Sequence, residues 1–287
     1  MSNSRSDENI EVLYLVAWVG ERMLNPLDSA RQFAESYLRF PAGVSHKLTL
    51  IVSGNMAPTQ IAELVSLFEG SPVSIIHVND IDFDIGKYRV ALQKSNSELC
   101  CIFNSHCVIR ASRWLAKFTQ CACDPRVGLV GATASYESLY SEAVARLAKR
   151  KPGLGMLWRG GIPGVVRNWG FPAFPNPHIR TSSFMIRRDV FQRVRWPRNP
   201  SNMGRYLFES GRWSLTRQVM KMGLDAVIVG YDGRRFGVSE WSSSGTFRQN
   251  EQHNLLVADN RTNDYAVAAP ELRRLLTIKA WGANAAK

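Results

Sequence analysis

The sequence contains no long hydrophobic run. None of its apolar stretches approaches the roughly 18 consecutive residues that a helix needs to cross a bilayer. Its first twelve residues, MSNSRSDENIEV, are polar where a secretory signal would be basic and then apolar. With 287 residues, 45% of them hydrophobic, the chain can still form a sizeable core. We therefore expect a globular, cytoplasmic protein whose contact with the inner membrane is at most peripheral.

Several common motifs are also missing. No GxGxxG follows the first predicted strand, and the chain has no GxxxxGK[ST], GxSxG or HExxH. Dinucleotide dehydrogenases, P-loop enzymes, α/β-hydrolases and zincins therefore lose their usual support. The five cysteines fit neither a disulfide framework nor a paired CxxC zinc site. We expect reduced thiols, because the one CxC pair, Cys121 and Cys123, offers only two thiolates to a metal.

Acidic residues are outnumbered by basic ones. The formal net charge of +12 and the pI of about 9.8 predict a surface that attracts anions, whether nucleic acid, anionic lipid or phosphorylated small molecules. The basic residues are spread along the chain, with clusters at RLAKRK (146–151) and RRD (187–189), and no long basic tail is present. This distribution favours a basic face or a membrane-facing surface, and an ordinary solvated face remains an alternative.

The first half of the chain alternates between strand-like and helix-like segments. Such a cadence produces right-handed crossovers, and hence an α/β fold with a mostly parallel central sheet flanked by helices. The predicted strands are 11–19, 47–55, 73–80, 98–105 and 127–135, and the predicted helices are 29–40, 59–70, 84–95 and 112–123.

The second half is less regular. Residues 137–179 are rich in Gly, Pro and aromatic residues without periodicity, which is typical of a functional loop. A strand within 180–191, a helix over 207–223 and a strand over 225–230 are then expected. The polar segment 240–262 contains a helix-like pattern at 250–260.

Polar residues follow the predicted strands at their carboxyl ends, where open α/β sheets bind ligands. They occur at Trp18–Glu21, Ser53–Asn55, Asn79–Asp80 and Asn104–His106. Solvated loops explain any one of these groups. That explanation is weaker for His106, because apolar Cys107, Val108 and Ile109 follow it directly.

Four segments, in this order, resemble a known fold. DIGKYRVALQKSNSELC (84–100) is similar to a Gly-containing helix near the donor, and CIFNSHCVIRASRWLAKF (101–118) to the DxD or DxH region. RTSSFMIRRDVFQRV (180–194) is similar to the strand where acceptor and donor meet, and FESGRWSLTRQVMKMGLDAVIVG (208–230) to the acidic motif opening the next helix. Together they resemble the glycosyltransferase A (GT-A) fold, as in family 2 glycosyltransferases and polypeptide N-acetylgalactosaminyltransferases.

The resemblance covers about residues 10–235 and implies a role for individual positions. It leaves residues 236–287 as an extension that packs on or closes over the active site, and places the 137–179 loop near the acceptor. Glu209 would be the catalytic base of an inverting reaction; as the alternative, it would be a carboxylate that only stabilises a helix start. The donor-binding residues would be Trp18, Asp80, Gly86, Lys87, Arg89, Asn104 and His106. The acceptor-binding residues would be His178, Arg180 and Thr181, although His178 and Arg180 could instead contact the diphosphate.

A divalent cation is part of the same resemblance. Mn²⁺ or Mg²⁺ would be held by His106 and Asp232, but Asn104 stands where the family has an acid, and an amide is a weaker ligand. Lys87, Arg89, Arg234 and Arg235 could instead neutralise the diphosphate of the donor.

We therefore expect a glycosyltransferase (hexosyltransferase-like) that uses a nucleotide sugar, most readily a UDP-sugar, in bacterial cell-surface polysaccharide assembly. The acceptor would be a glycan or lipid-linked molecule, and the basic surface would suit peripheral contact with an anionic membrane. The alternative is a catalytically degenerate GT-A domain that binds a glycan or a partner. Nucleic-acid binding rests on charge alone and is not expected.

Overall fold

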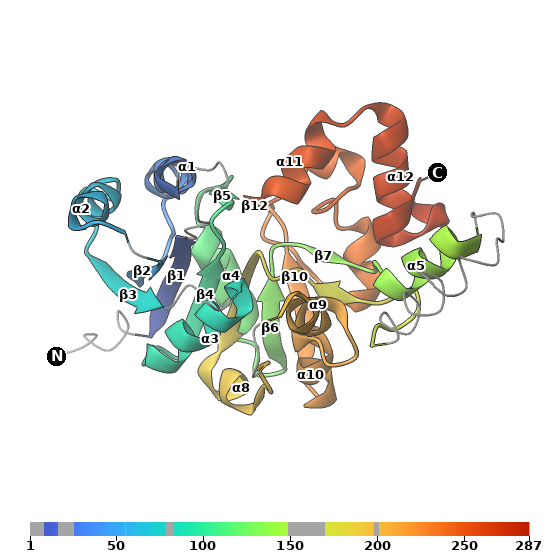
Figure 1. Ribbon diagram of the computed structural model, residues 1–287, viewed down its shortest axis with the longest axis horizontal. Helices are drawn as coiled ribbons and strands as arrows, with labels where there is room; N and C mark the ends of the chain where they lie inside the picture. The colour runs from blue at the N-terminus through green and yellow to red at the C-terminus, as the bar shows by residue number, and fades with distance from the viewer. Residues whose placement is uncertain are drawn as a thin grey trace.

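The central feature of the computed structural model is an eight-stranded sheet (Figure 1). The structure describes residues 9–16, 26–54, 56–78, 83–148, 170–197 and 201–286. The strands follow the order β11-β10-β6-β9-β4-β1-β2-β3. Their bounds are β1 (Ile10–Val16), β2 (Lys47–Ser53), β3 (Val73–Val78), β4 (Leu99–Phe103), β6 (Val127–Gly131), β9 (Ser183–Arg187), β10 (Asp225–Val229) and β11 (Arg235–Phe236).

Most neighbouring strands of this sheet are parallel. β1 pairs in parallel with β2 and β4, β2 with β3, and β6 with β10. β9 runs antiparallel between β4 and β6, and β11 forms an antiparallel edge beside β10. The predicted α/β class with a mostly parallel sheet is therefore confirmed.

Helices cover both faces of the sheet. Because side chains alternate along a strand, Val12 and Tyr14 of β1 enter one core and Leu13 and Leu15 enter the other. The first core is closed by α1 (Pro26–Arg39), α2 (Pro58–Ser66) and α4 (Trp114–Ala122). The second is closed by α3 (Asp84–Lys94), α8 (Arg188–Arg193), α9 (Asn202–Ser210) and α10 (Leu215–Lys221). In Figure 1, α1 and α2 lie above the strands, and α3 and α8 lie below them.

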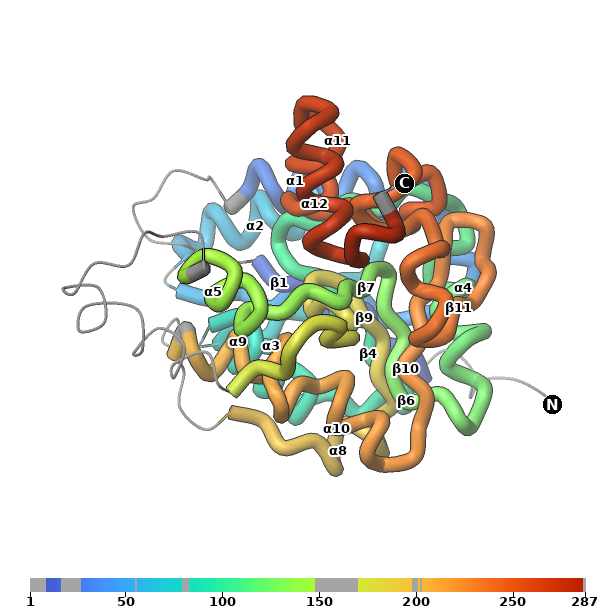
Figure 2. The backbone as a smooth tube through the Cα atoms, turned by 90° about the vertical axis from the view of Figure 1, so that its right-hand side faces the viewer, coloured from blue at the N-terminus to red at the C-terminus, as the bar shows by residue number. Residues whose placement is uncertain are grey.

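The C-terminal segment returns to the sheet. Its helices α11 (Asn260–Val267) and α12 (Pro270–Trp281) lie together at the top of the molecule in Figures 1 and 2. Trp281 donates its indole N–H to the Phe247 carbonyl at 2.6 Å and belongs to the second core. The remaining short elements are η2 (Val238–Ser243), η3 (Asn250–Gln252) and η4 (Ala283–Ala286).

Two small antiparallel ladders connect distant parts of the chain. β12 (Val257–Ala258) pairs with β5 (Val108–Ile109), and β7 (Ala134–Ser135) pairs with β8 (His178–Ile179). The first ladder explains the apolar residues after His106, because they form a strand that the C-terminal segment covers. Within the described residues, no helix combines the length and the apolar character needed to span a bilayer.

Four predicted elements differ from the structure. The single strand predicted over 127–135 is two strands, because β6 (Val127–Gly131) belongs to the central sheet and β7 (Ala134–Ser135) pairs with β8. The expected irregular stretch 137–179 contains helix α5 (Leu139–Ala148) as well as β8. The single helix predicted over 207–223 is two helices, because the chain turns at Gly211 and Ser214 caps α10 by accepting the Arg217 N–H. A Cβ at position 211 would lie only 2.6 Å from the Leu207 carbonyl oxygen, so the turn requires glycine.

The helix predicted over 250–260 is also wrong. Only the 3₁₀ turn at Asn250–Gln252 forms there, and β12 follows it. The helix α11 starts at Asn260 instead, because the Asp259 carboxylate caps it by accepting the Thr262 N–H at 3.0 Å.

Candidate functional site

A pocket of about 330 Å³ opens at the carboxyl edge of the parallel strands. It lies where β4 ends at Asn104, where α3 begins at Asp84, and where Thr181 and Ser182 lead into β9. Helix α9, the start of α5 (Leu139–Ala148) and the C-terminal segment also contribute to its walls. Its charged lining residues are Asp84, Glu137, Glu142, Arg180, Arg205, Glu209, Arg248, Arg261 and Lys279.

Glu209 is one of four half-buried carboxylates that line this pocket. The Thr181 hydroxyl donates a short hydrogen bond to its Oε1. Burial raises the pKa of the Glu209 carboxyl, which outweighs the lowering effects of Thr181, Arg205 and Arg180. The expected position of Glu209 at a helix start is wrong, because it lies in the last turn of α9, where the helix dipole does not stabilise a negative charge.

The predicted acceptor residues His178, in β8, and Arg180 and Thr181, between β8 and β9, all line the pocket. Arg180 forms an ion pair with Asp259 at 2.6 Å, and its guanidinium lies 4.4 Å from the centre of the Phe247 ring. His178 is buried, its Nδ1 lies 2.9 Å from the Asn176 carbonyl, and burial lowers the pKa of its imidazole. His178 therefore forms part of the pocket wall as a neutral ring.

The Asn104–Cys107 turn is held by its own polar groups. Asn104 Oδ1 accepts the His106 N–H at 3.0 Å, as in an Asx turn, and lies 3.4 Å from the Cys107 thiol. The Ser105 carbonyl accepts the Tyr14 hydroxyl at 3.0 Å. Asn104 lines the pocket, while half-buried His106 is not among its lining residues.

The other predicted donor residues lie elsewhere in the fold. Lys87 is buried and donates to the Ser53 hydroxyl, at the end of β2, at 3.0 Å. Arg89 donates to the Pro197 carbonyl at 3.2 Å, and Gly86 belongs to the first turn of α3. None of the three lines the Glu209 pocket. Trp18 and Asp80 lie outside the described residues.

The predicted metal ligands do not fit a divalent cation. Asp232 is exposed, its Oδ1 accepts the Arg234 N–H at 2.9 Å, and it does not line the pocket. The Asn104 amide oxygen is engaged in its own turn. Across the described ranges, no three His, Cys, Asp or Glu side chains come together as a metal site. The cysteines are free: Cys121 is buried and Cys123 is exposed.

Four cations of the pocket belong to none of the motifs considered in the sequence. Arg205 comes from α9, and Arg248, Arg261 and Lys279 come from the C-terminal segment. Arg248 reaches Glu137 at 2.6 Å across more than a hundred residues of chain. Pairings over such a separation leave no periodic pattern or local motif in the sequence.

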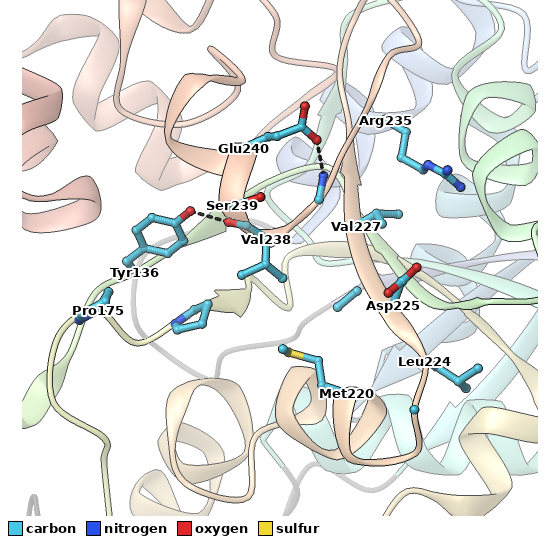
Figure 3. A pocket seen from close by; sticks show the side chains of 14 residues that line it. Tyr136, Pro175, Met220, Leu224, Asp225, Val227, Arg235, Val238, Ser239 and Glu240 are labelled. Atoms are coloured by element: carbon cyan, nitrogen blue, oxygen red, sulfur yellow. Dashed lines mark hydrogen bonds between the residues drawn. The ribbon is translucent and has the colours of Figure 1, made fainter.

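A larger hollow of about 930 Å³ lies along β10 (Figure 3). Met220, Leu224 and Val227 give it an apolar wall, and Tyr136 donates a hydrogen bond to the Val238 carbonyl at its rim. Arg235, one of the cations considered for the donor diphosphate, lines it, whereas Glu209 and the predicted acceptor residues do not. Its lining reaches the amino end of β10 at Asp225. Ligands of open α/β sheets bind at the opposite edge, so the smaller pocket is the better catalytic candidate.

Comparisons with known proteins give structural likenesses only. No protein-family model and no curated protein matches the sequence. The chain is similar to the crystal structure of glucosyl-3-phosphoglycerate synthase from Mycobacterium tuberculosis in complex with Mn²⁺, uridine diphosphate and phosphoglyceric acid. The identity is 13%, the match covers 77% of this chain and 67% of that one, and the TM-score is 0.45.

A second similar structure is CMP:2-keto-3-deoxy-manno-octonic acid synthetase complexed with CTP. The identity is 16%, the match covers 77% of this chain and 88% of that one, and the TM-score is 0.43. Likenesses at these identities and scores do not assign an activity to this chain.

Proposed function

We propose that this chain is a GT-A glycosyltransferase that transfers a sugar from a nucleoside-diphosphate sugar to an acceptor hydroxyl, with inversion and with Glu209 as the base. The observation that carries the proposal is the Glu209 carboxylate, hydrogen-bonded by Thr181 in a pocket at the carboxyl edge of the sheet. The order of motifs along the chain supports the GT-A assignment independently.

The environment of Glu209 suits proton abstraction. An inverting transfer needs a carboxylate that takes the proton from the attacking hydroxyl. A carboxyl whose pKa is raised by burial is a stronger base once it is ionised. The Thr181 hydroxyl fixes one carboxylate oxygen and leaves the other for the acceptor. Thr181 is therefore a positioning residue in this proposal.

Leaving-group stabilisation is assigned to cationic side chains. The departing diphosphate carries negative charge that must be neutralised. We assign this role to the chain's own cations. Lys87 marks the donor side, because its ammonium lies at the end of β2 beside Ser53. We place the nucleotide over the ends of β1 and β2, most readily as a UDP-sugar, with Trp18 and Asp80 as further donor residues.

The acceptor is placed on the other side of Glu209, against Arg180 and the C-terminal segment. A glycan or lipid-linked acceptor in surface polysaccharide assembly remains the broader proposal. The net charge of +12 would then favour peripheral contact with an anionic membrane.

One observation favours a second candidate, a GT-A domain that binds without catalysis. Asn104 replaces the expected acid and serves as a turn residue. Such a module would keep the pocket and its ligand while lacking turnover.

Turnover by the Glu209→Gln variant separates the two candidates. The wild-type chain should release nucleoside diphosphate from at least one member of a panel of UDP-, GDP-, CDP- and dTDP-sugars in the presence of candidate acceptors. Glu209→Gln should lower that turnover by about 10² to 10⁴-fold, as loss of a general base does. Its affinity for the nucleotide should be unchanged.

The exposed Glu69→Gln variant serves as a matched control, because Glu69 lies outside the pocket. It should turn over at the wild-type rate. Wild-type activity in Glu209→Gln would contradict the base assignment, and nucleotide binding with no turnover by the wild type on the whole panel would favour the binding module.

A further inference from the structure

Three guanidinium groups converge on the C-terminal wall of the pocket. Arg180 and Arg248 contact the same Phe247 ring, with their central carbons 4.4 and 4.8 Å from its centroid. Arg261 lines the same pocket. Burial lowers the pKa of the Arg248 guanidinium, and Arg180 and Arg261 lower it further against the opposing charge of Glu137. Like charges gathered in this way repel one another, and neighbouring anions reduce that repulsion.

The carboxylates nearby do not satisfy all these cations. Asp259 pairs with Arg180 at 2.6 Å, and Glu137 pairs with Arg248 at 2.6 Å. Arg261 forms no ion pair within the described residues, and neither does Arg205 on the α9 wall. Arg205 instead lies over the Phe83 and Tyr206 rings, with its central carbon 5.5 and 4.8 Å from their centroids. Among the described residues, these two guanidinium groups therefore have no carboxylate at ion-pair distance.

Two hydrogen-bond donors are also left over. Arg248 Nε and Arg205 Nε are both buried, and neither finds a hydrogen-bond partner in the part of the chain that the structure describes. The Arg248 side chain is only 7% exposed, so bulk water does not compensate for the missing bond. Buried donors without partners are rare in proteins, and a ligand is one of the ordinary explanations.

The backbone that carries Arg248 is strained. Arg248, Asn250, Glu251 and Gln252 all have φ between 44° and 55°, in the left-handed region that favours glycine. The loop is held in this form by Gln252, whose Oε1 accepts the Arg248 N–H at 3.1 Å and whose Nε2 donates to the Thr262 carbonyl at 2.9 Å. Strain of this kind persists where surrounding contacts enforce it, and it clusters at ligand sites.

We propose that this pocket binds a phosphate group between Arg248, Arg261 and Arg205, and that in the proposed transfer this group belongs to the acceptor. Guanidinium groups match the oxygens of a phosphate through paired N–H donors, and several are needed to hold a dianion. The proposal rests on the proposed function for the identity of the ligand as acceptor.

The position of the site favours the acceptor over the donor. Arg248 and Arg261 belong to the C-terminal segment, while the donor side is marked by Lys87 at the end of β2. Glu209 lines the pocket together with these arginines. A base must contact the acceptor hydroxyl, so an anion beside it is well placed to be part of the acceptor.

Calorimetric titration of the full chain with inorganic phosphate tests the site directly. The ionic strength of the buffer should be held constant at a physiological value with a chloride salt, because salt screens exposed charges. The wild type should bind one phosphate per chain. Arg261→Gln and Arg205→Gln should each bind it about tenfold more weakly, since each removes a charge-assisted contact. Arg274→Gln, an exposed arginine on α12 outside the pocket, should bind as the wild type does.

Arg261 is exposed, so its variant should fold even if replacement of buried Arg248 does not. Absence of saturable phosphate binding by the wild type would overturn the proposal, and so would equal affinities of Arg261→Gln, Arg205→Gln and Arg274→Gln.

A second titration on protein saturated with UDP distinguishes the two sources of phosphate. Unchanged or tighter phosphate binding supports the acceptor assignment. Competition between UDP and phosphate would assign these arginines to the donor diphosphate and overturn it.

Glu209→Gln keeps the outcomes of the two proposals apart, because it removes a negative charge from the pocket and should bind phosphate at least as tightly as the wild type while losing turnover. Phosphate binding without turnover on any donor would contradict the proposed function and leave the anion site in place.

Discussion

The turn after β4 and the C-terminal wall of the pocket lie at the same edge of the sheet but use their polar groups differently. In the Asn104–Cys107 turn, the Asn104 amide oxygen accepts the His106 N–H, the Asn104 carbonyl accepts the Cys107 N–H, and the Ser105 carbonyl accepts the Tyr14 hydroxyl. On the C-terminal wall, Arg248 keeps a buried Nε without a partner. A polar sequence at a strand end can thus be satisfied within the fold, whereas buried donors left over indicate a place for a ligand.

The ion pair between Glu137 and Arg248 offers the largest expected effect on stability. The Arg248 side chain is 7% exposed, so Glu137→Gln would leave a buried charge without its partner. We expect a loss of about 3 kcal/mol in the free energy of unfolding, measured by urea denaturation.

Glu63→Gln is the matched control, because Glu63 and Arg31 form an ion pair in which both side chains are 50% exposed. It should change stability by less than about 1 kcal/mol. Equal losses in the two variants would show that the C-terminal wall gains nothing from the pair.

The Asn104 turn should respond more weakly. Asn104→Ala removes the acceptor for the His106 N–H, which we expect to cost about 1 kcal/mol in the free energy of unfolding. Asn104→Asp can form the same Asx turn and should be close to neutral. Urea denaturation with a parallel UDP titration checks both effects. If Asn104→Ala kept its stability but lost UDP affinity, the amide would be a ligand group and the contrast between the two regions would fail.

The order of elements in the first half of the sheet could be predicted from sequence, because each strand there carries its own apolar run. The antiparallel direction of β9 could not be predicted from sequence. The segment RTSSFMIRRDVF has the composition of a strand, and that composition is the same for parallel and antiparallel pairing. The break between α9 and α10 was missed for a related reason. It depends on the close approach of Gly211 to Leu207, which the apolar spacing on either side does not reveal.

The candidate site divides in the same way. Glu209, Asn104, His178, Arg180 and Thr181 were identified from short motifs, and the structure places them around one pocket. Arg248, Arg261 and Lys279 belong to no motif, and they reach the pocket only because β12 pairs with β5 and carries the C-terminal segment back across the sheet edge. The predicted metal ligand Asp232 follows β10 as expected but does not line this pocket. Correct prediction of a strand end therefore did not show that its residues belong to the same site.

The pH dependence of stability should show the smallest effect and concerns Glu209 itself. Burial raises the pKa of this carboxyl in the folded chain, so the folded state holds its proton more tightly than the unfolded state. The stability associated with this group is therefore fully present below the ordinary glutamate pKa and is lost as pH rises through the raised value. Glu209→Gln cannot ionise, so its melting temperature should match that of the wild type at low pH and exceed it above that window. In a chain of this size each kcal/mol of stability corresponds to about 2–4 °C in melting temperature.

Thr181→Val should widen the difference in melting temperature, because the Thr181 hydrogen bond favours the ionised carboxyl. If the melting temperatures of the wild type and Glu209→Gln differed by the same amount at every pH, the pKa of Glu209 would be the same in the folded and unfolded chain. Water would then reach Glu209 as freely as it reaches the exposed carboxylates.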